Sequence, residues 1–311
     1  MRTRPFVPLL LVVASTACHG APASPKPAAT PAPDAAAARD CSADYPSLPL
    51  AELPPPVRRE FCRFAQDNFC YCGCPHMLSG CLKEHPACPH ASRMAAVALA
   101  ELATGATAEA ASQFVAGYYD SFKPQARAQI DVSKLPCLGA GPDAKLTLVE
   151  FSDFDCPHCK VARPLLEKLV RSRKDARLCF MSFPLHAHSG LAATAAAYAQ
   201  EKGQFWRFHD LLFDEQESRA TLDEKGYVAA LVKLGGEAGL DGARLENALH
   251  DAKLLEAVDA QRQLGRSLGV DGTPFVFVNG RRLPPISPEF LDLTIGDELE
   301  WIGNGGAWAK D

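Results

Sequence analysis

The chain has 311 residues and a formal net charge of −5 at pH 7. This length exceeds what one typical hydrophobic core fills, so about two domains are expected. Acidic and basic residues are mixed along the chain, which excludes the basic face of a nucleic-acid-binding protein, and nucleic acid is not expected as a partner.

The first 17 residues have the pattern of a secretory signal peptide, with two arginines before an apolar run from Phe6 to Ala14. This run is too short to span a bilayer. The next residues, STAC at 15–18, resemble a bacterial lipobox, although Ser15 stands where that motif usually has Leu. We predict an exported protein of the bacterial envelope or periplasm, held to the membrane only by a lipid on Cys18. A soluble secreted form is the alternative.

Residues 18–45 are rich in Ala and Pro and predict a disordered linker. Residues 46–125 predict a small cysteine-rich helical module. Its first helix is expected in PPPVRREFCRFAQDNF, where four apolar residues share one face: Val57, Phe61, Phe64 and Ala65. A helical hairpin is expected from Ser92 to Thr104 and from Thr107 to Phe122, with Gly105 ending the first helix and Thr107 capping the second.

From residue 126 to 311 the pattern changes to strands alternating with helices. Strands are predicted in AQIDV, KLTLVEF, RLCFMSF and FVFV, with a helix from Pro157 to Arg171 after the second of them. A mostly helical insertion is expected at about 189–268, broken at Gly203, at Gly235-Gly236 and near Asp241. The region thus predicts an α/β fold with an inserted helical subdomain.

A turn motif and a helix-start motif follow the insertion. Asn279-Gly280, between FVFV and RRL, is the strongest short signal for a β-hairpin. Ser287-Pro288 has the cap and first-turn proline of a helix, which is expected to run to about Trp301.

The stretch FDCPHCK carries a pair of cysteines, Cys156 and Cys159, with Pro157 and His158 between them. Cys156 falls where a strand passes into a helix, so its sulfur should lie at a helix N-terminus, which favours a thiolate. His158, if protonated, adds a second stabilising charge. A zinc site needs two further ligands at comparable spacing, and none follows in this strand and helix. The pair is therefore interpreted as a redox dithiol, in which Cys156 reacts first and Cys159 second.

The motifs FSDFDCPHCK, FPLHAHSGLAATAAAYAQEKGQFWRFHDLLF and GVDGTPFVFVNGRRL resemble the DsbA family of thioredoxin-fold thiol-disulfide oxidoreductases over residues 128–303. This resemblance implies that the Cys156/Cys159 disulfide acts without another cofactor. It implies a cis Pro274 facing the dithiol, with the Thr273 backbone pairing to an extended substrate. It also implies that Glu150 is a buried acid beneath the dithiol that relays a proton.

The other cysteines leave several pairings open. The sequence has twelve cysteines, and removing Cys18 leaves an odd set of eleven, so at least one is unpaired or joined to another chain. Cys137 and Cys179 are candidates for one disulfide. His186 and His188 form an H-x-H pair, for which a role in a loop or at a helix start is expected rather than metal binding.

The dense group in NFCYCGCPHMLSGCLKEHPACPH allows two interpretations. Disulfides to one another and to Cys41 and Cys62 are favoured in an oxidising compartment. Metal binding is the alternative, with five candidate ligands: Cys70, Cys72, Cys74, Cys81 and Cys88. A cysteine motif followed by a helical hairpin ending in GYYDSF also resembles, over residues 60–125, the thiol-reductase domain of cytochrome c maturation proteins of the CcmH type, although CYCGC departs from that family's C-x-x-C.

Together these features predict an exported enzyme that oxidises cysteine pairs of envelope proteins through CPHC and is then reoxidised by a redox partner. One alternative is a reductase or isomerase that acts on envelope or apocytochrome disulfides and is re-reduced by its partner. Another is a metal-binding or assembly module that uses the CYCGC cluster.

Overall fold

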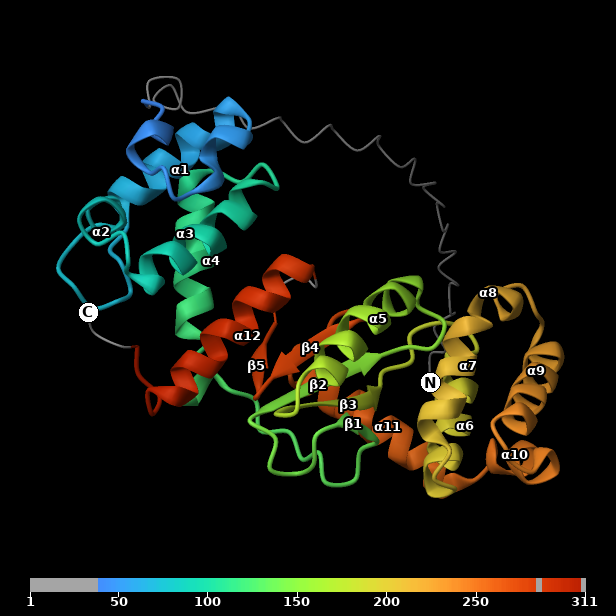
Figure 1. Cartoon of the computed structure of the whole chain (residues 1–311). Helices are drawn as coiled ribbons and strands as arrows, with labels where there is room; N and C mark the ends of the chain where they lie inside the picture. The colour runs from blue at the N-terminus through green and yellow to red at the C-terminus, as the bar shows by residue number, and fades with distance from the viewer. Residues whose placement is uncertain (1–38, 284–286, 309–311) are drawn as a thin grey trace, which may run out of the picture. The chain divides into compact units, whose positions relative to one another are not determined.

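The computed structural model of the chain describes residues 39–283 and 287–308 (Figure 1). The predicted signal peptide, the lipidation site Cys18 and most of the predicted linker lie outside the described residues. None of the helices in the described ranges combines the length and apolar composition needed to cross a bilayer.

The N-terminal part of the described chain is helical. Its 3-10 turns are η2 (Ser42–Asp44), η3 (Pro49–Glu52) and η4 (Pro124–Ala126), and its helices are α1 (Pro55–Asp67), α2 (Leu78–Glu84), α3 (Pro89–Leu102) and α4 (Ala108–Asp120). The predicted signals between the last two helices are confirmed: Gly105 has a φ of +93°, and the Thr107 side chain accepts a hydrogen bond from the Ala110 amide at 3.3 Å. Of the four apolar residues predicted to share a face of α1, Phe61, Phe64 and Ala65 are buried in one core and Val57 packs against it.

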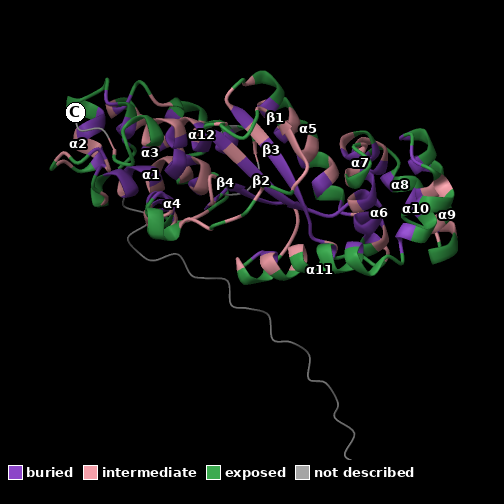
Figure 2. Ribbon diagram, turned by 90° about the horizontal axis from the view of Figure 1, so that it is seen from below, coloured by how far each residue is buried: buried purple, intermediate pink, exposed green. Residues whose placement is uncertain are grey.

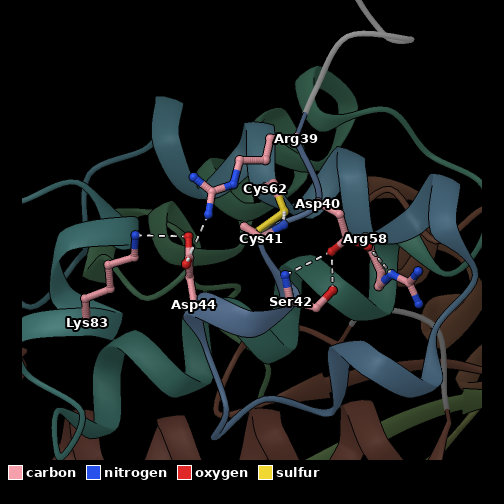
Figure 3. Close-up of a disulfide and its surroundings, with 8 residues drawn as sticks. All are labelled: Arg39, Asp40, Cys41, Ser42, Asp44, Arg58, Cys62 and Lys83. Atoms are coloured by element: carbon pink, nitrogen blue, oxygen red, sulfur yellow. Dashed lines mark hydrogen bonds and ion pairs between the residues drawn. A yellow bond between two sulfur atoms is a disulfide. The ribbon is translucent and has the colours of Figure 1, made fainter.

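A disulfide between Cys41 and Cys62 joins the segment before η2 to α1 (Figure 3). The Cys41 amide also donates to Cys62 Sγ at 2.9 Å. Nearby, Asp44 accepts a hydrogen bond from Lys83 Nζ on α2 at 3.1 Å. These contacts fix the N-terminal segment to two helices. The expectation that Cys41 and Cys62 pair with the dense cysteine group is wrong, because they pair with each other.

The central sheet has five strands in the order β1-β3-β2-β4-β5. The strands are β1 (Cys137–Gly139), β2 (Leu146–Ser152), β3 (Ala176–Ser182), β4 (Phe275–Val278) and β5 (Arg281–Arg282). Only β2 and β3 pair in parallel, joined by helix α5 (Pro157–Ser172), and the other neighbours are antiparallel. This is the mixed sheet of a thioredoxin fold.

Alternation along β2 determines what each face of the sheet carries. Leu146 and Leu148 pack with α5 and α12 (Pro288–Gly303), while Val149 and Phe151 pack on the other face with the C-terminal end of α11 (Ala252–Ser267). Figure 2 shows the central strands β2 and β3 as mostly buried and much of α11 as exposed. By the same alternation, Glu150 and Ser152 face α5.

Six helices lie between β3 and β4: α6 (Ser189–Glu201), α7 (Phe205–Asp214), α8 (Gln216–Arg219), α9 (Glu224–Glu237), α10 (Gly242–Ala248) and α11. The predicted ends at Gly203 and Asp241 are confirmed, since Gly203 has a φ of +70° and Asp241 caps α10. The predicted break at Gly235-Gly236 is wrong, because α9 continues through both residues. A Cβ on Gly235 would lie 2.4 Å from Leu245, so this glycine permits close packing of α9 and α10.

The predicted strand at AQIDV is also wrong. Residues 128–132 form no strand, although Ala128, Ile130 and Val132 pack against the core beside β4. The Ala128 amide donates to Gly280 O at 2.7 Å, and the sheet instead gains the short β1. The alternating apolar residues of this segment therefore pack against the sheet, but the segment does not form one of its strands.

The candidate pair Cys137 and Cys179 forms a disulfide that joins β1 to β3. The predicted hairpin is also confirmed: Asn279 and Gly280 have φ values of 49° and 79° between β4 and β5. At the next signal, the Ser287 side chain caps α12 by accepting from the Phe290 amide at 3.2 Å.

Helix α12 also packs against the N-terminal helices. Phe290 belongs to the apolar core formed with α3 and α4. Tyr118 Oη on α4 donates to Asp297 Oδ2 at 2.7 Å, and Glu298 is fully buried between Arg127 and Arg281. The cysteine-rich part and the sheet therefore share one helix.

Candidate active site

The two cysteines of CPHC occupy different environments at the start of α5. Cys156 is the N-cap residue, and Cys159 lies in the first turn with no exposed surface. Pro157 and His158 are exposed. Both cysteines are in the dithiol form. The predicted helix N-terminus is therefore present, with one sulfur at its end and the other beneath it.

The environment separates the acidities of the two thiols. The pKa of Cys156 is lowered to about 5, first by a hydrogen bond from the Cys159 thiol and further by Thr273 and by the backbone amides of Cys159 and His158, against an opposing effect of burial. Burial raises the pKa of Cys159, and Cys156 and Glu150 raise it further. At neutral pH the stable form of the pair thus has a thiolate on Cys156 and a proton on Cys159.

The loop before β4 faces Cys156. The Thr273-Pro274 peptide bond is cis, as the resemblance implied, and both residues are half-buried. Cys156 Sγ lies 3.2 Å from Thr273 O and donates to it when it is a thiol. The loop thus brings a backbone carbonyl to the reactive sulfur, although 117 residues separate the two in sequence.

Glu150 lies on the face of β2 that α5 covers and is 2 % exposed. Burial raises its pKa to about 7, and the charges of Glu167 and Cys156 act in the same direction. Its Oε1 atom is buried and has no hydrogen-bond partner among the described residues. A carboxyl with this pKa exchanges protons readily near neutral pH.

Asp153 organises the loop that leads into the dithiol. It is 1 % exposed and accepts hydrogen bonds from the amides of Asp155, Leu185 and His186 at 2.6 to 3.1 Å. His186 Nδ1 also lies 2.9 Å from Asp153 Oδ2.

The hydrogen bond between His186 and Asp153 raises the pKa of His186, and the nearby charge of Cys156 contributes in the same direction. The sequence interpretation expected His186 to act in a loop or at a helix start, and its imidazole additionally lies beside Asp153, where it experiences the charge of Cys156. The sequence analysis expected a protonated His158 side chain to stabilise the Cys156 thiolate. In the structure it is the backbone amide of His158 that contacts Cys156.

Two buried side chains of α8 hold the same loop from the helical insertion. Gln216 Nε2 donates to the carbonyls of Phe154 and Cys156 at 2.9 and 3.0 Å. Arg219 Nη2 donates to Asp155 Oδ1 at 3.0 Å and to Phe154 O at 3.3 Å. No sequence signal indicated these contacts, because α8 lies about sixty residues further along the chain.

A pocket of about 240 Å³ opens beside this loop. Its lining comes from both the loop and the insertion: Asp155, His186, Ala187, His188, Gln216, Arg219, Ala220 and Tyr227. Phe205 and Phe213 are buried in the apolar core of the insertion, and Trp206 packs against it.

The dense cysteine group adopts neither of the pairings expected for it with Cys41 and Cys62. Cys70, Cys72, Cys74 and Cys81 carry free thiols whose sulfurs lie within 4.8 Å of one another. Cys88, the fifth candidate ligand, is buried but is not part of this group. Across the described part of the chain, neither Cys156 nor Cys159 belongs to a group of potential metal ligands.

Known proteins resemble the part of the chain that carries CPHC. The family model described as thioredoxin matches residues 136–297, just over half of the chain. The crystal structure of oxidised BdbD from Bacillus subtilis superimposes with a TM-score of 0.51 and 26% identity, covering 56% of this chain and 97% of BdbD. Disulfide bond formation protein D of Bacillus subtilis is 27% identical over 161 residues, 49% of this chain and 71% of that protein.

A second kind of relative is much longer. Na(+)/H(+) antiporter NhaA 3 of Salinispora tropica is 34% identical over 146 residues, which are 46% of this chain and 21% of the antiporter. The chain thus spans about a fifth of the length of this relative. On the family match and the shared fold, the chain belongs to the thioredoxin family, in its DsbA-like form.

Proposed function

We propose that the chain is a thiol-disulfide oxidoreductase that oxidises cysteine pairs in exported proteins through Cys156 and Cys159. The observation that carries the proposal is the opposite pKa shift of the two thiols. A stabilised Cys156 thiolate stabilises the reduced enzyme, and a dithiol whose reduced form is stabilised is a strong oxidant of other thiols.

The reaction begins with the disulfide form of the enzyme. A substrate thiolate attacks Cys156 Sγ, the Cys156–Cys159 bond breaks, and Cys159 leaves as a thiolate that takes a proton from Glu150. The second substrate thiolate attacks the substrate sulfur of the mixed disulfide, and Cys156 leaves as a thiolate. The substrate has lost two electrons and gained a disulfide, and the enzyme dithiol has gained them.

Each remaining site residue has a defined part in this sequence. The backbone at Thr273, before cis Pro274, pairs with an extended substrate segment beside Cys156. The amide of His158 and the charge of His186 stabilise the leaving Cys156 thiolate. A redox partner in the envelope then reoxidises the dithiol, which needs no further cofactor.

We propose that this chemistry takes place in the bacterial envelope or periplasm, with the chain lipid-anchored at Cys18. The Cys41–Cys62 and Cys137–Cys179 disulfides support an oxidising compartment. A reductase or isomerase is the alternative and would use the same atoms in the reverse direction. The lowered pKa of Cys156 favours the oxidase.

Oxidative refolding of a reduced, unfolded disulfide protein tests the proposal. The oxidised full chain is expected to transfer its disulfide stoichiometrically. Cys159→Ser, first loaded at Cys156 as a mixed disulfide with glutathione, is expected to release glutathione to the attacking substrate thiolate and to accumulate a mixed disulfide between Cys156 and the substrate. Failure of the oxidised chain to form any substrate disulfide, while the reduced chain breaks existing ones, would overturn it in favour of the reductase.

A further inference from the structure

The N-terminal helical part contains a cluster of four cysteine sulfurs that does not include the CPHC dithiol. We propose that Cys70, Cys72, Cys74 and Cys81 form a binding site for one thiophilic closed-shell metal ion, Zn(II) or Cu(I). The site does not depend on the proposed redox function, because neither cysteine of CPHC belongs to it.

The local fold brings these residues together from a loop and a helix. An antiparallel bridge between Phe69 and Met77 closes the loop, and the Cys70 amide donates to His76 O at 3.2 Å. Gly73, at φ +86°, allows the chain to turn between Cys72 and Cys74. Three cysteines on alternate positions of CYCGC thus point their sulfurs toward one centre.

Helix α2 supplies the fourth sulfur. It begins immediately after the bridge, and the Cys81 amide donates to Met77 O at 3.1 Å in its first turn. Cys81 Sγ then lies 2.9 Å from Cys74 Sγ and 3.9 Å from Cys72 Sγ. The bridge and the helix start therefore fix where the fourth ligand stands relative to the loop.

The sulfur distances fit a shared ligand better than separate disulfides. Cys74 Sγ lies 2.9 Å from both Cys72 Sγ and Cys81 Sγ, although a sulfur can form a disulfide with only one partner. Sulfurs around a tetrahedral ion with metal–sulfur bonds of about 2.3 Å lie about 3.8 Å apart. A small expansion of the two short distances, with all four sulfurs already within 4.8 Å, would produce that arrangement.

The chemistry of the site selects the ion. Every proposed ligand is a cysteine sulfur, a soft donor that favours Zn(II) and Cu(I) over Mg²⁺ or Ca²⁺. Cys70, Cys72 and Cys81 are at most 4 % exposed, whereas Cys74 is partly exposed. The ion would therefore enter beside Cys74 and be shielded from solvent by the other three residues.

Metal content of the full chain tests the site. Protein purified without oxygen is incubated separately with Zn(II) and with Cu(I), desalted and analysed for bound metal. About one ion per chain is expected, as a structural thiolate site binds. Cys72→Ser and Cys81→Ser should each reduce retention at least tenfold after a chelator wash. The matched control, Cys156→Ser/Cys159→Ser, should retain as much metal as the wild type.

Substitution by Co(II) in the unaltered chain gives a second measurement that does not depend on a variant folding. Strong visible bands of a tetrahedral thiolate complex would support the site, as would preferential retention of either Zn(II) or Cu(I). The proposal is overturned if metal is lost equally from the control variant. It is also overturned if the unreduced wild type binds no metal and its four cysteines resist alkylation under denaturing conditions, which would identify them as disulfides.

Discussion

Cys156 and Cys159 lie in the same helical turn, but their surroundings assign them opposite protonation states. Cys156 receives hydrogen bonds from the Cys159 thiol and from backbone amides, while Cys159 is buried above Glu150. The first thiol is thereby suited to leave and the second to hold a proton. The proposed direction of electron transfer, from the substrate to the enzyme, rests on this difference between two residues of the same type.

The stability of the reduced protein should depend on pH through Cys156. Its folded pKa of about 5 lies below the unfolded value, so its stabilising effect is complete above the unfolded pKa of about 8.5 and is lost as pH falls toward 5. We predict that the free energy of unfolding of the reduced form, relative to the oxidised form, decreases over this range. Denaturant unfolding of both forms measures the difference. A pH-independent difference would contradict the assignment, and Cys156→Ser is the control.

Glu150→Gln should increase stability at alkaline pH and slow disulfide transfer. The folded pKa of about 7 exceeds the ordinary 4.5, so the carboxyl destabilises the fold as pH rises from about 4.5 to 7. The gain at pH 8 is expected to approach about 3 kcal/mol and to vanish below pH 4. Denaturant unfolding and the rate of mixed-disulfide formation give the two readouts. Glu217→Gln, at an exposed glutamate, is the control, and equal effects of both variants would refute the role of Glu150.

At the scale of elements, the site is assembled where β2, α5, the loop before β4 and the helical insertion meet. The sequence identified the strand-to-helix junction, the cis-proline loop and the insertion, since each has a local signal or a family motif. It did not identify the role of α8, because a helix of four residues has no periodicity to detect and its partners are distant. The strand predicted at AQIDV is absent for a related reason. Alternating apolar and polar residues indicate that one face of a segment is buried, but they do not show that its backbone pairs with a neighbouring strand.

Gln216→Leu tests the contribution of α8. The variant removes the donors to the carbonyls of Phe154 and Cys156 in a buried setting, so a loss of about 1–3 kcal/mol in the free energy of unfolding is expected. The freed loop should also raise the pKa of Cys156, measured from the pH dependence of its alkylation. The neighbouring exposed Glu217→Gln serves as the control. An unchanged Cys156 pKa would show that α8 does not position the dithiol.

At the scale of the whole molecule, a thioredoxin fold and a cysteine-rich helical part are joined through α12. Tyr118 and Phe290 connect α4 to this helix, and Glu298 connects it to Arg281 at the hairpin. None of these contacts was predictable, because each depends on tertiary packing of distant residues. Cysteine pairing was open for the same reason: spacing alone does not reveal that Cys41 meets Cys62 while four other sulfurs converge elsewhere.

The reduction potential of the Cys156–Cys159 pair distinguishes the proposed oxidase from a reductase. The full chain is equilibrated in glutathione buffers of increasing oxidised fraction, and the redox state of the peptide carrying CPHC is read by alkylation and mass spectrometry, with Cys156→Ser as the control. A potential above that of the glutathione couple is predicted, since the Cys156 thiolate stabilises the reduced form. A potential below that couple would contradict the account and identify the chain as a reductase.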